Sequence, residues 1–310
     1  MATSILLTGG TGFLGRHLSP ELASWARHKQ CGLKTLVRPP LERPPVQRLR
    51  ELGFELIVSD LRELSVEELA PRLTDVGTIV HLVGILEGSR KLLLEVNYHG
   101  TAKLLTAARA AGVTKIIHLS SMGATANPQF PYAYSAWLAE QAVQRSGLQF
   151  IIFRPPVLIG PSAPFTTGLI RMARNWPFIL LPKSKTKFQP LSVGDLVHCI
   201  LQMLEAQGLP DRIVELGGPE IVTLKHLVQM IQADLGTRKP MVYLPRRPLR
   251  LSIRILRQLG LDPPLVASHL IGTDMVAGPG AVEAACNFAP RPLDQALDLQ
   301  AEAEASIIRQ

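Results

Sequence analysis

Short apolar runs recur along the chain and alternate with segments of helical periodicity. The runs are apolar on both faces, as expected for strands of a parallel sheet covered by helices. They lie at 4–10, 33–38, 54–60, 78–84, 115–121, 150–160 and 212–218. Between them, 101–112 and 137–147 show helical spacing and end at glycines. This alternation predicts a doubly wound α/β fold with a parallel sheet.

The pattern changes after Gly160. Residues 161–187 predict a loop, a helix and a second loop, and 188–208 then return to a helix. Beyond about Gly218 the sequence predicts helices and loops with proline-rich joints. We therefore predict a sheet domain over 1–160 plus 188–218. The remaining segments, 161–187 plus 219–310, should form a smaller, mainly helical C-terminal lobe.

Composition and charge narrow the classes of function. The chain has 310 residues, 46% of them hydrophobic and 19% charged, which is typical of a globular protein. The formal net charge of +8 favours anionic partners. Nucleic acid is not an expected partner, because aromatic residues make up only 5% and no binding motif is present.

No secretory signal is visible, and no segment approaches the ~18–20 apolar residues of a membrane span. We therefore expect a cytoplasmic protein. Cys31, Cys199 and Cys286 lie far apart in the sequence, without metal-ligand spacing. We expect three buried, free thiols and no metal site.

A glycine-rich segment, "TGGTGFLGR" at 8–16, follows the first predicted strand and opens the first predicted helix. Gly9 permits a tight turn, Gly12 lets a pyrophosphate approach the backbone, and Gly15 lets helix and strand pack closely. The helix N-terminus offers free N–H groups to phosphates. In this strand–turn–helix context the spacing predicts a Rossmann dinucleotide-binding fold.

The charged residues near this segment bear on the choice of cofactor. An NAD site usually has a carboxylate at the end of the second strand, where this chain has Arg38. Arg16 and Arg38 are suited to hold a 2′-phosphate, which favours NADP(H) over NAD(H), and the alternative is that both arginines are simply solvated. Asp60 follows the third strand. It either accepts from the adenine amino group or caps the helix that follows.

Several motifs together resemble the extended and atypical short-chain dehydrogenase/reductases. The matching pieces are "TGGTGFLG" (8–15), "DL" (60–61), "HLVG" (81–84), "VNYHGT" (96–101), "HLSSMGA" (118–124), "RPPVLIGP" (154–161) and "FQPLSVGDL" (188–196). The later pieces "ELGGPEIVTLKHLV" (215–228) and "HLIGTDMV" (269–276) are similar to the group containing the NAD(P)H-binding accessory subunit of respiratory complex I.

The resemblance implies further cofactor contacts. Asn97 would line the side of the fold that binds the cofactor. Ser120 and Ser121 would end a strand beside the nicotinamide. For each of these positions, ordinary packing within the sheet is the alternative. The full set of implied cofactor residues is Gly9, Gly12, Phe13, Leu14, Gly15, Arg16, Arg38, Asp60, Leu61, Val83, Gly84, Asn97, Ser120, Tyr132, Pro155 and Val157.

The catalytic residues of the family match only in part. Active members use a serine or threonine, a tyrosine, and a lysine four residues after the tyrosine. Ser121 and Tyr132 match the first two, but Ala136 stands where the lysine belongs. A tyrosine without a neighbouring cation keeps a pKa near ~10 and is a poor acid–base catalyst at neutral pH.

Three functions remain open from the sequence. The first is an NADP(H)-binding accessory or regulatory subunit with weak or absent catalysis. The second is an active NADPH-dependent reductase or epimerase on a small carbonyl compound, using Tyr132 and Ser121. The third is a regulator that senses the NADPH ratio. Residues 244–261 carry arginines at helical spacing along one face of a predicted helix. Such a helix either contacts a protein partner or an anionic membrane surface, which would place the protein peripheral to a membrane, or packs on its own domain with the arginines in water.

Overall fold

A computed structural model describes residues 4–63, 65–245 and 274–297. The chain forms two compact units. The first comprises Met1–Pro155 and Leu196–Glu215, and the second comprises Pro156–Asp195 and Leu216–Gln310. These boundaries lie a few residues away from the division drawn from the sequence.

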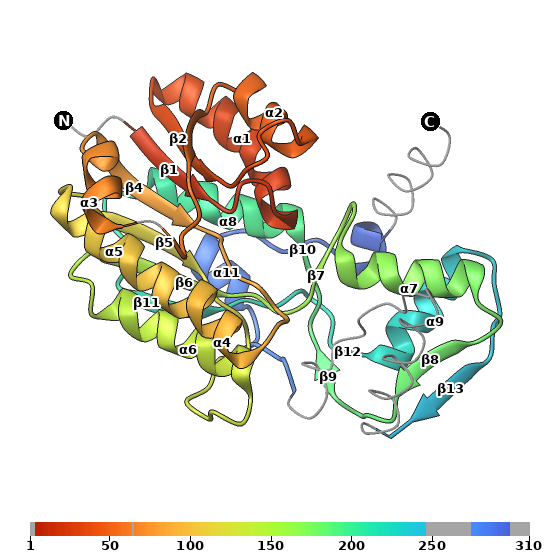
Figure 1. Cartoon of the computed structure of the whole chain (residues 1–310). Helices are drawn as coiled ribbons and strands as arrows, with labels where there is room; N and C mark the ends of the chain where they lie inside the picture. The colour runs from red at the N-terminus through yellow and green to blue at the C-terminus, as the bar shows by residue number, and fades with distance from the viewer. Residues whose placement is uncertain (1–3, 64, 246–273, 298–310) are drawn as a thin grey trace. The chain divides into compact units, whose positions relative to one another are not determined.

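The first unit is built on a seven-stranded parallel sheet with the order β11-β6-β5-β4-β1-β2-β3 (Figure 1). Every strand predicted from the apolar runs contributes to it, so the predicted fold class is confirmed. The strands are β1 Ser4–Thr8, β2 Gly32–Val37, β3 Glu55–Val58, β4 Val76–His81, β5 Lys115–Leu119, β6 Gln149–Arg154 and β11 Arg212–Glu215.

Helices cover both faces of this sheet. Figure 1 shows α3, α5 and α6 on one face and α1, α2 and α8 on the other. The helical elements are α1 Phe13–Lys29, α2 Pro44–Glu51, α3 Val66–Leu69, the 3-10 turn Ala70–Leu73, α4 Arg90–Leu93, the π-helical turn Leu94–His99, α5 Gly100–Ala110, α6 Pro131–Gln144 and α8 Val193–Glu205. No helix within the described ranges has the length and apolar composition to cross a membrane.

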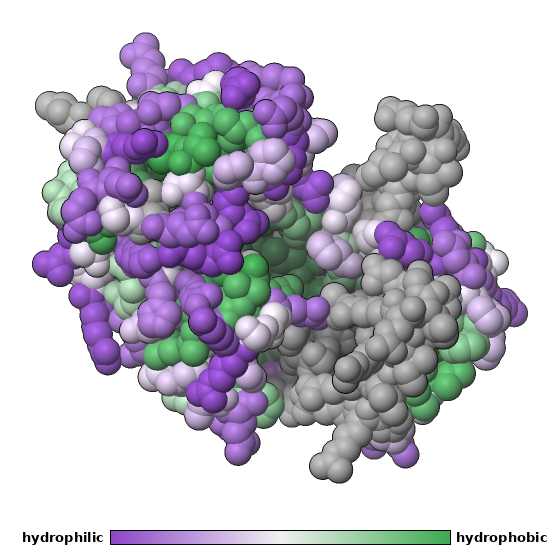
Figure 2. All heavy atoms as spheres, viewed as in Figure 1, coloured by the Kyte–Doolittle hydropathy of each residue, from purple (hydrophilic) through white to green (hydrophobic). Residues whose placement is uncertain are grey.

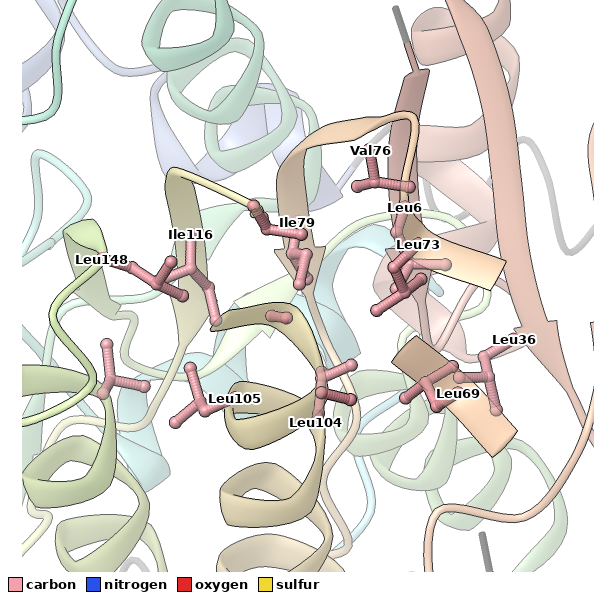
Figure 3. Close-up of a cluster of buried hydrophobic side chains, with 14 of the residues drawn as sticks. Leu6, Leu36, Leu69, Leu73, Val76, Ile79, Leu104, Leu105, Ile116 and Leu148 are labelled. Carbon is pink, nitrogen blue, oxygen red and sulfur yellow. The ribbon is translucent and has the colours of Figure 1, made fainter. Parts of the chain in front are cut away.

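A cluster of buried aliphatic side chains fixes one face of the sheet against its helices. Leu6 of β1, Ile79 of β4 and Ile116 of β5 point toward Leu104 of α5, and all four are fully buried (Figure 3). Full burial of one such side chain stabilises the fold by roughly 1.5–3 kcal/mol. A dense aliphatic core therefore holds these strands against α5.

Within its described residues, the second unit contains short helices and three two-stranded sheets. The helices of this described part are α7 Pro164–Asn175, α9 Leu224–Asp234 and α11 Ala281–Cys286. The strand pairs are β7 Leu158–Ile159 with β10 Leu191–Ser192, β9 Lys187–Phe188 with β12 Val222–Thr223, and β8 Ile179–Pro182 with β13 Met241–Leu244.

Three details of the sequence prediction are wrong in this part of the chain. Residues 161–187 were expected to form a loop, a helix and a second loop, but β8 lies in the second of these loops and β9 begins at its end. The run 150–160 was expected to be one strand, but it divides into β6 and β7. Pro155 and Pro156 lie between them, and proline cannot donate to a strand ladder. The region after Gly218 was expected to hold only helices and loops, yet it contains β12 and β13. Their apolar runs are too short to be distinguished from loops by periodicity.

The cysteines also differ from the prediction. Cys31 is a free, half-buried thiol, and burial raises its pKa. Cys199 and Cys286 are fully buried and disulfide-bonded. The prediction of free thiols is therefore wrong for these two residues, because a disulfide depends on distances in the folded chain that sequence spacing does not reveal.

Candidate cofactor and catalytic site

The glycine loop is shaped by contacts that leave no room for side chains. Gly9 has φ +77, and a Cβ there would lie 2.9 Å from the carbonyl carbon of Leu82, just after β4. A Cβ on Gly15 would lie 2.2 Å from the carbonyl oxygen of Gly9. Both positions therefore need glycine, the first for its left-handed backbone and the second for close packing of α1 against the loop.

The start of α1 is open toward an anion. Gly12 is the N-cap residue, no side chain caps the helix, and its first turn holds no acidic residue. The N–H groups of Phe13 and Leu14, in the first turn after this cap, consequently lack the side-chain acceptor that most helices provide. Gly12 and Arg16 are exposed on this side. The backbone and charge at this terminus fit a pyrophosphate.

An arginine that sequence reasoning missed lies at the end of β3. Arg62 forms a bidentate pair with Asp60, with Nη2 2.8 Å from Oδ2 and Nε 3.1 Å from Oδ1. The backbone N–H of Arg62 also donates to Oδ1. These hydrogen bonds lower the pKa of Asp60 below its ordinary value. The helix-cap alternative for Asp60 is wrong, because Ser65 caps α3 with a reciprocal bond from Glu68.

Asp60 also forms a weak ion pair with Arg38, which directly follows β2. Nη1 of Arg38 lies 3.9 Å from Oδ2 of Asp60, and its side chain is 64% exposed. Arg43 donates to the backbone carbonyl groups of Arg38 and Pro40, which braces the loop after β2. Two guanidinium groups thus share one carboxylate where β2 and β3 end, and Arg38 keeps most of its donors free.

Asn97 joins the loop after β4 to α6. Its side-chain oxygen accepts from the N–H of Ile85 at 2.8 Å, and its amide nitrogen donates to the Ile85 carbonyl group. The same nitrogen donates to the hydroxyl of Ser135 in α6. Asn97 lies in the π-helical turn, a deviation often found at functional sites. This network fixes the backbone that carries the predicted residues Val83 and Gly84.

One face of α6 carries the candidate catalytic residues. Tyr132, Ala136 and Glu140 follow each other at four-residue spacing, so they share a face of the helix. Tyr132 forms a hydrogen bond with Ser121, the residue predicted to act with it. Burial raises the pKa of Tyr132 above its ordinary value, although the bond to Ser121 acts in the opposite sense. Ala136 is buried and brings no charge.

Arg154, the cation that pairs with Glu140 of this face, is held by two carboxylates. Glu140 is fully buried and holds Arg154 through two bonds of 2.6 and 2.7 Å. Arg154 also donates to Glu215, at the end of β11, at 3.0 Å. The hydroxyl of Ser120 donates to Glu140 rather than remaining free. Two carboxylates around one guanidinium leave a net charge of about −1, so Arg154 does not replace the missing lysine.

The remaining predicted residues are distributed over both units. Leu61 is buried in the aliphatic core, where ordinary packing accounts for it. The carbonyl group of Pro155 accepts from the N–H of Met122 in the first unit. Val157 belongs to the second unit, where its carbonyl group accepts from Leu191.

Comparisons with known proteins agree on the family. The model of the NAD dependent epimerase/dehydratase family matches residues 5–217. The chain is 26% identical over 229 residues to NADH dehydrogenase (ubiquinone) 1 alpha subcomplex subunit 9, mitochondrial, from Dictyostelium discoideum, covering 72% of this chain and 61% of that protein. It is 31% identical over 197 residues to a ceramide reductase from Caulobacter vibrioides, covering 62% and 57%. The matches thus span less than two thirds of these relatives.

Solved structures show the same fold. The UDP-glucuronic acid 4-epimerase from Bacillus cereus, solved with UDP-glucuronic acid and NAD, has a TM-score of 0.76 at 17% identity. The alignment covers 98% of this chain and 99% of that one. With its parallel sheet, its glycine loop and a family model that matches most of its length, the chain belongs to the NAD dependent epimerase/dehydratase family, whose members bind a nicotinamide dinucleotide.

Proposed function

We propose that this protein binds NADP(H) and acts as a cofactor-binding accessory or regulatory subunit with weak or absent catalysis. The observation that carries the proposal is the α6 face. Tyr132 and Ser121 are paired, but Ala136 supplies no cation and the neighbouring Glu140 neutralises Arg154. A sensor of the NADPH ratio would use the same properties, because it also needs binding without rapid turnover.

The preference for the phosphorylated cofactor rests on the ends of β2 and β3. Arg38 is exposed and only loosely paired with Asp60, so it is available to a 2′-phosphate. Arg62 lies on the same carboxylate and adds a second guanidinium group nearby. Arginine suits such a group because its planar donors hold phosphate oxygens in pairs. We therefore extend the proposed phosphate clamp from Arg16 and Arg38 to Arg62.

Calorimetric titration with NADPH and NADH tests this preference. NADPH should bind at least tenfold more tightly, since hydrogen bonds to charged groups contribute about 1.5–3 kcal/mol each. Arg38→Ala should weaken NADPH binding by about tenfold or more and leave NADH binding almost unchanged. The matched control is Arg48→Ala, which removes an exposed arginine of α2 instead. Equal affinities for the two cofactors, unaffected by Arg38→Ala, would contradict the clamp.

A second function is favoured by the bond between Tyr132 and Ser121. This pair is the arrangement an NADPH-dependent reductase or epimerase would need to move a proton to a small carbonyl group. One similar protein is named a ceramide reductase. If the protein as it stands reduces a carbonyl compound rapidly, and Tyr132→Phe abolishes this, the second function replaces the first.

The location and partner are part of the same proposal. We propose a cytoplasmic protein that is peripheral to a membrane or bound to a protein partner through 244–261. Apart from Leu244 and Pro245, this segment lies outside the described residues. Its support is the arginine spacing in the sequence.

A further inference from the structure

The described residues of the second unit contain a pair of strands, one buried and one exposed. Strands β8 and β13 pair in parallel, with Leu180 opposite Val242 and Leu181 opposite Tyr243. Strand β8 is buried along its whole length, whereas β13 is not. Val242 and Tyr243 are 39% and 42% exposed. Neighbouring residues of a strand point to opposite faces, so β13 presents apolar side chains on both of its sides.

More apolar and aromatic surface lies beside β13. Phe178, which directly precedes β8, is 37% exposed and packs edge-to-face against Trp176 at 6.3 Å. The N–H of Ile179 donates to the carbonyl group of Pro240, which fixes this turn next to the start of β13. Figure 2 shows hydrophobic residues at the position that β13 occupies in Figure 1, with hydrophilic residues beside them.

Cations outnumber acids in the sequence that adjoins this surface. Asp234 precedes the second segment below, and the side chain of Asp274 accepts from the backbone N–H of Lys187 at 2.9 Å. Residues 171–187, which include β8, and 235–245, which include β13, contain no aspartate or glutamate. Lys183 and Lys185 are exposed, and Nζ of Lys239 is tied to the carbonyl group of Arg174 at the end of α7. The cations of the two segments are Arg171, Arg174, Lys183, Lys185, Lys187, Arg238 and Lys239.

We infer that this β13 surface, comprising Trp176, Phe178, Val242, Tyr243 and the adjoining cations, binds the headgroup region of an anionic phospholipid bilayer. Aromatic side chains favour the membrane–water interface, and lysine and arginine are attracted to anionic headgroups. A flat protein interface would use one face of a sheet. Here side chains protrude on both faces of one strand, which suits shallow insertion among lipid headgroups, where water still solvates the backbone.

Vesicle sedimentation with the full chain tests the inference. Binding to vesicles of phosphatidylcholine mixed with phosphatidylglycerol should exceed binding to phosphatidylcholine alone, and it should fall as salt is raised. Lys183→Glu with Lys185→Glu should weaken binding at least 25-fold, because each cation near an anionic surface contributes roughly fivefold. Phe178→Ser with Tyr243→Ser should weaken it at least about tenfold through lost apolar insertion.

Matched controls separate this surface from general charge and hydrophobicity. Arg90→Glu with Lys225→Glu reverses two exposed cations elsewhere, and Ile221→Ser removes an exposed apolar residue of the same unit. Both should leave vesicle binding unchanged. Calorimetric binding of NADPH should be unaffected by every variant, so this test is independent of the proposed function.

Three results would overturn the inference. The first is no binding to anionic vesicles, which would leave an acidic protein as the partner of this surface. The second is equal binding to neutral and anionic vesicles. The third is loss of binding with Arg250→Glu and Arg254→Glu while the β13 variants bind normally, because the membrane contact would then belong to 244–261.

Discussion

The glycine loop and the α6 face of the first unit differ in the charges that they offer to a ligand. At the loop, the start of α1 has no capping side chain, and Arg38 is exposed nearby. Along α6, Tyr132 is followed one turn later by the uncharged Ala136, and the nearby Arg154 is paired with Glu140. One region is prepared for an anion, and the other lacks the charge that would activate its tyrosine.

Under the proposed function, cofactor affinity and acid–base chemistry are separate properties of one fold. Binding a dinucleotide depends on backbone N–H groups, glycines and arginines near β1, β2 and β3. Proton transfer depends on the pKa of one tyrosine and on its neighbours. A chain can therefore keep the first and lose the second through a single residue such as Ala136.

The largest expected effect concerns the ion pair beneath the α6 face. Glu140→Ala removes a fully buried carboxylate and leaves Arg154 with only Glu215. Breaking a buried pair in this way should lower the free energy of unfolding by about 3–5 kcal/mol. Chemical denaturation measures the loss. Glu215→Ala, whose carboxylate is 45% exposed, is the control and should cost much less. Similar losses for both would show that burial of Glu140 is unimportant.

The glycine loop can be broken separately. A methyl group on Gly15 would lie 2.2 Å from the carbonyl oxygen of Gly9, so Gly15→Ala must displace α1 or the loop. We expect a loss of about 1–3 kcal/mol in the free energy of unfolding. Cofactor binding, followed by calorimetry, should fall below detection. Gly278→Ala is the control, because a Cβ there meets no neighbouring atom. Normal cofactor binding by Gly15→Ala would refute the proposed role of the loop.

A smaller effect concerns pH and the strands that lie between these regions. His81 of β4 and His118 of β5 stack with ring centroids 5.3 Å apart, and burial lowers the pKa of His118 to about 4. Between pH 6.5 and about 4, His118 is protonated in the unfolded chain but not in the folded one. The free energy of unfolding therefore falls as the pH falls through this range. His118 alone should account for about 2 kcal/mol between pH 7 and 5.

Denaturation at both pH values measures this dependence. His118→Phe keeps an aromatic ring beside His81 but cannot titrate, so its pH dependence should be smaller by that amount. An unchanged dependence would mean that His118 is protonated in the folded protein or is neutral in both states.

The sequence predicted the sheet well because each strand is a continuous apolar run, and parallel strands buried on both faces require such runs. It also predicted the glycine loop, since turn and packing constraints depend on local spacing. It did not predict the Glu140–Arg154 pair or the role of Arg62, because these depend on which side chains meet in space. A signal was present for Glu140, an acid on the same helix face as Tyr132 and Ala136, but the sequence alone did not identify its partner.

The most direct test of the central claim is the rate of NADPH oxidation with a panel of aldehydes and ketones. The unmodified protein should bind NADPH but turn over very slowly, and Ala136→Lys should raise the rate by about 10²–10⁴-fold, the range of general acid–base catalysis. Adding Tyr132→Phe to Ala136→Lys should remove this gain. Rapid reduction by the unmodified protein, abolished by Tyr132→Phe alone, would contradict the account.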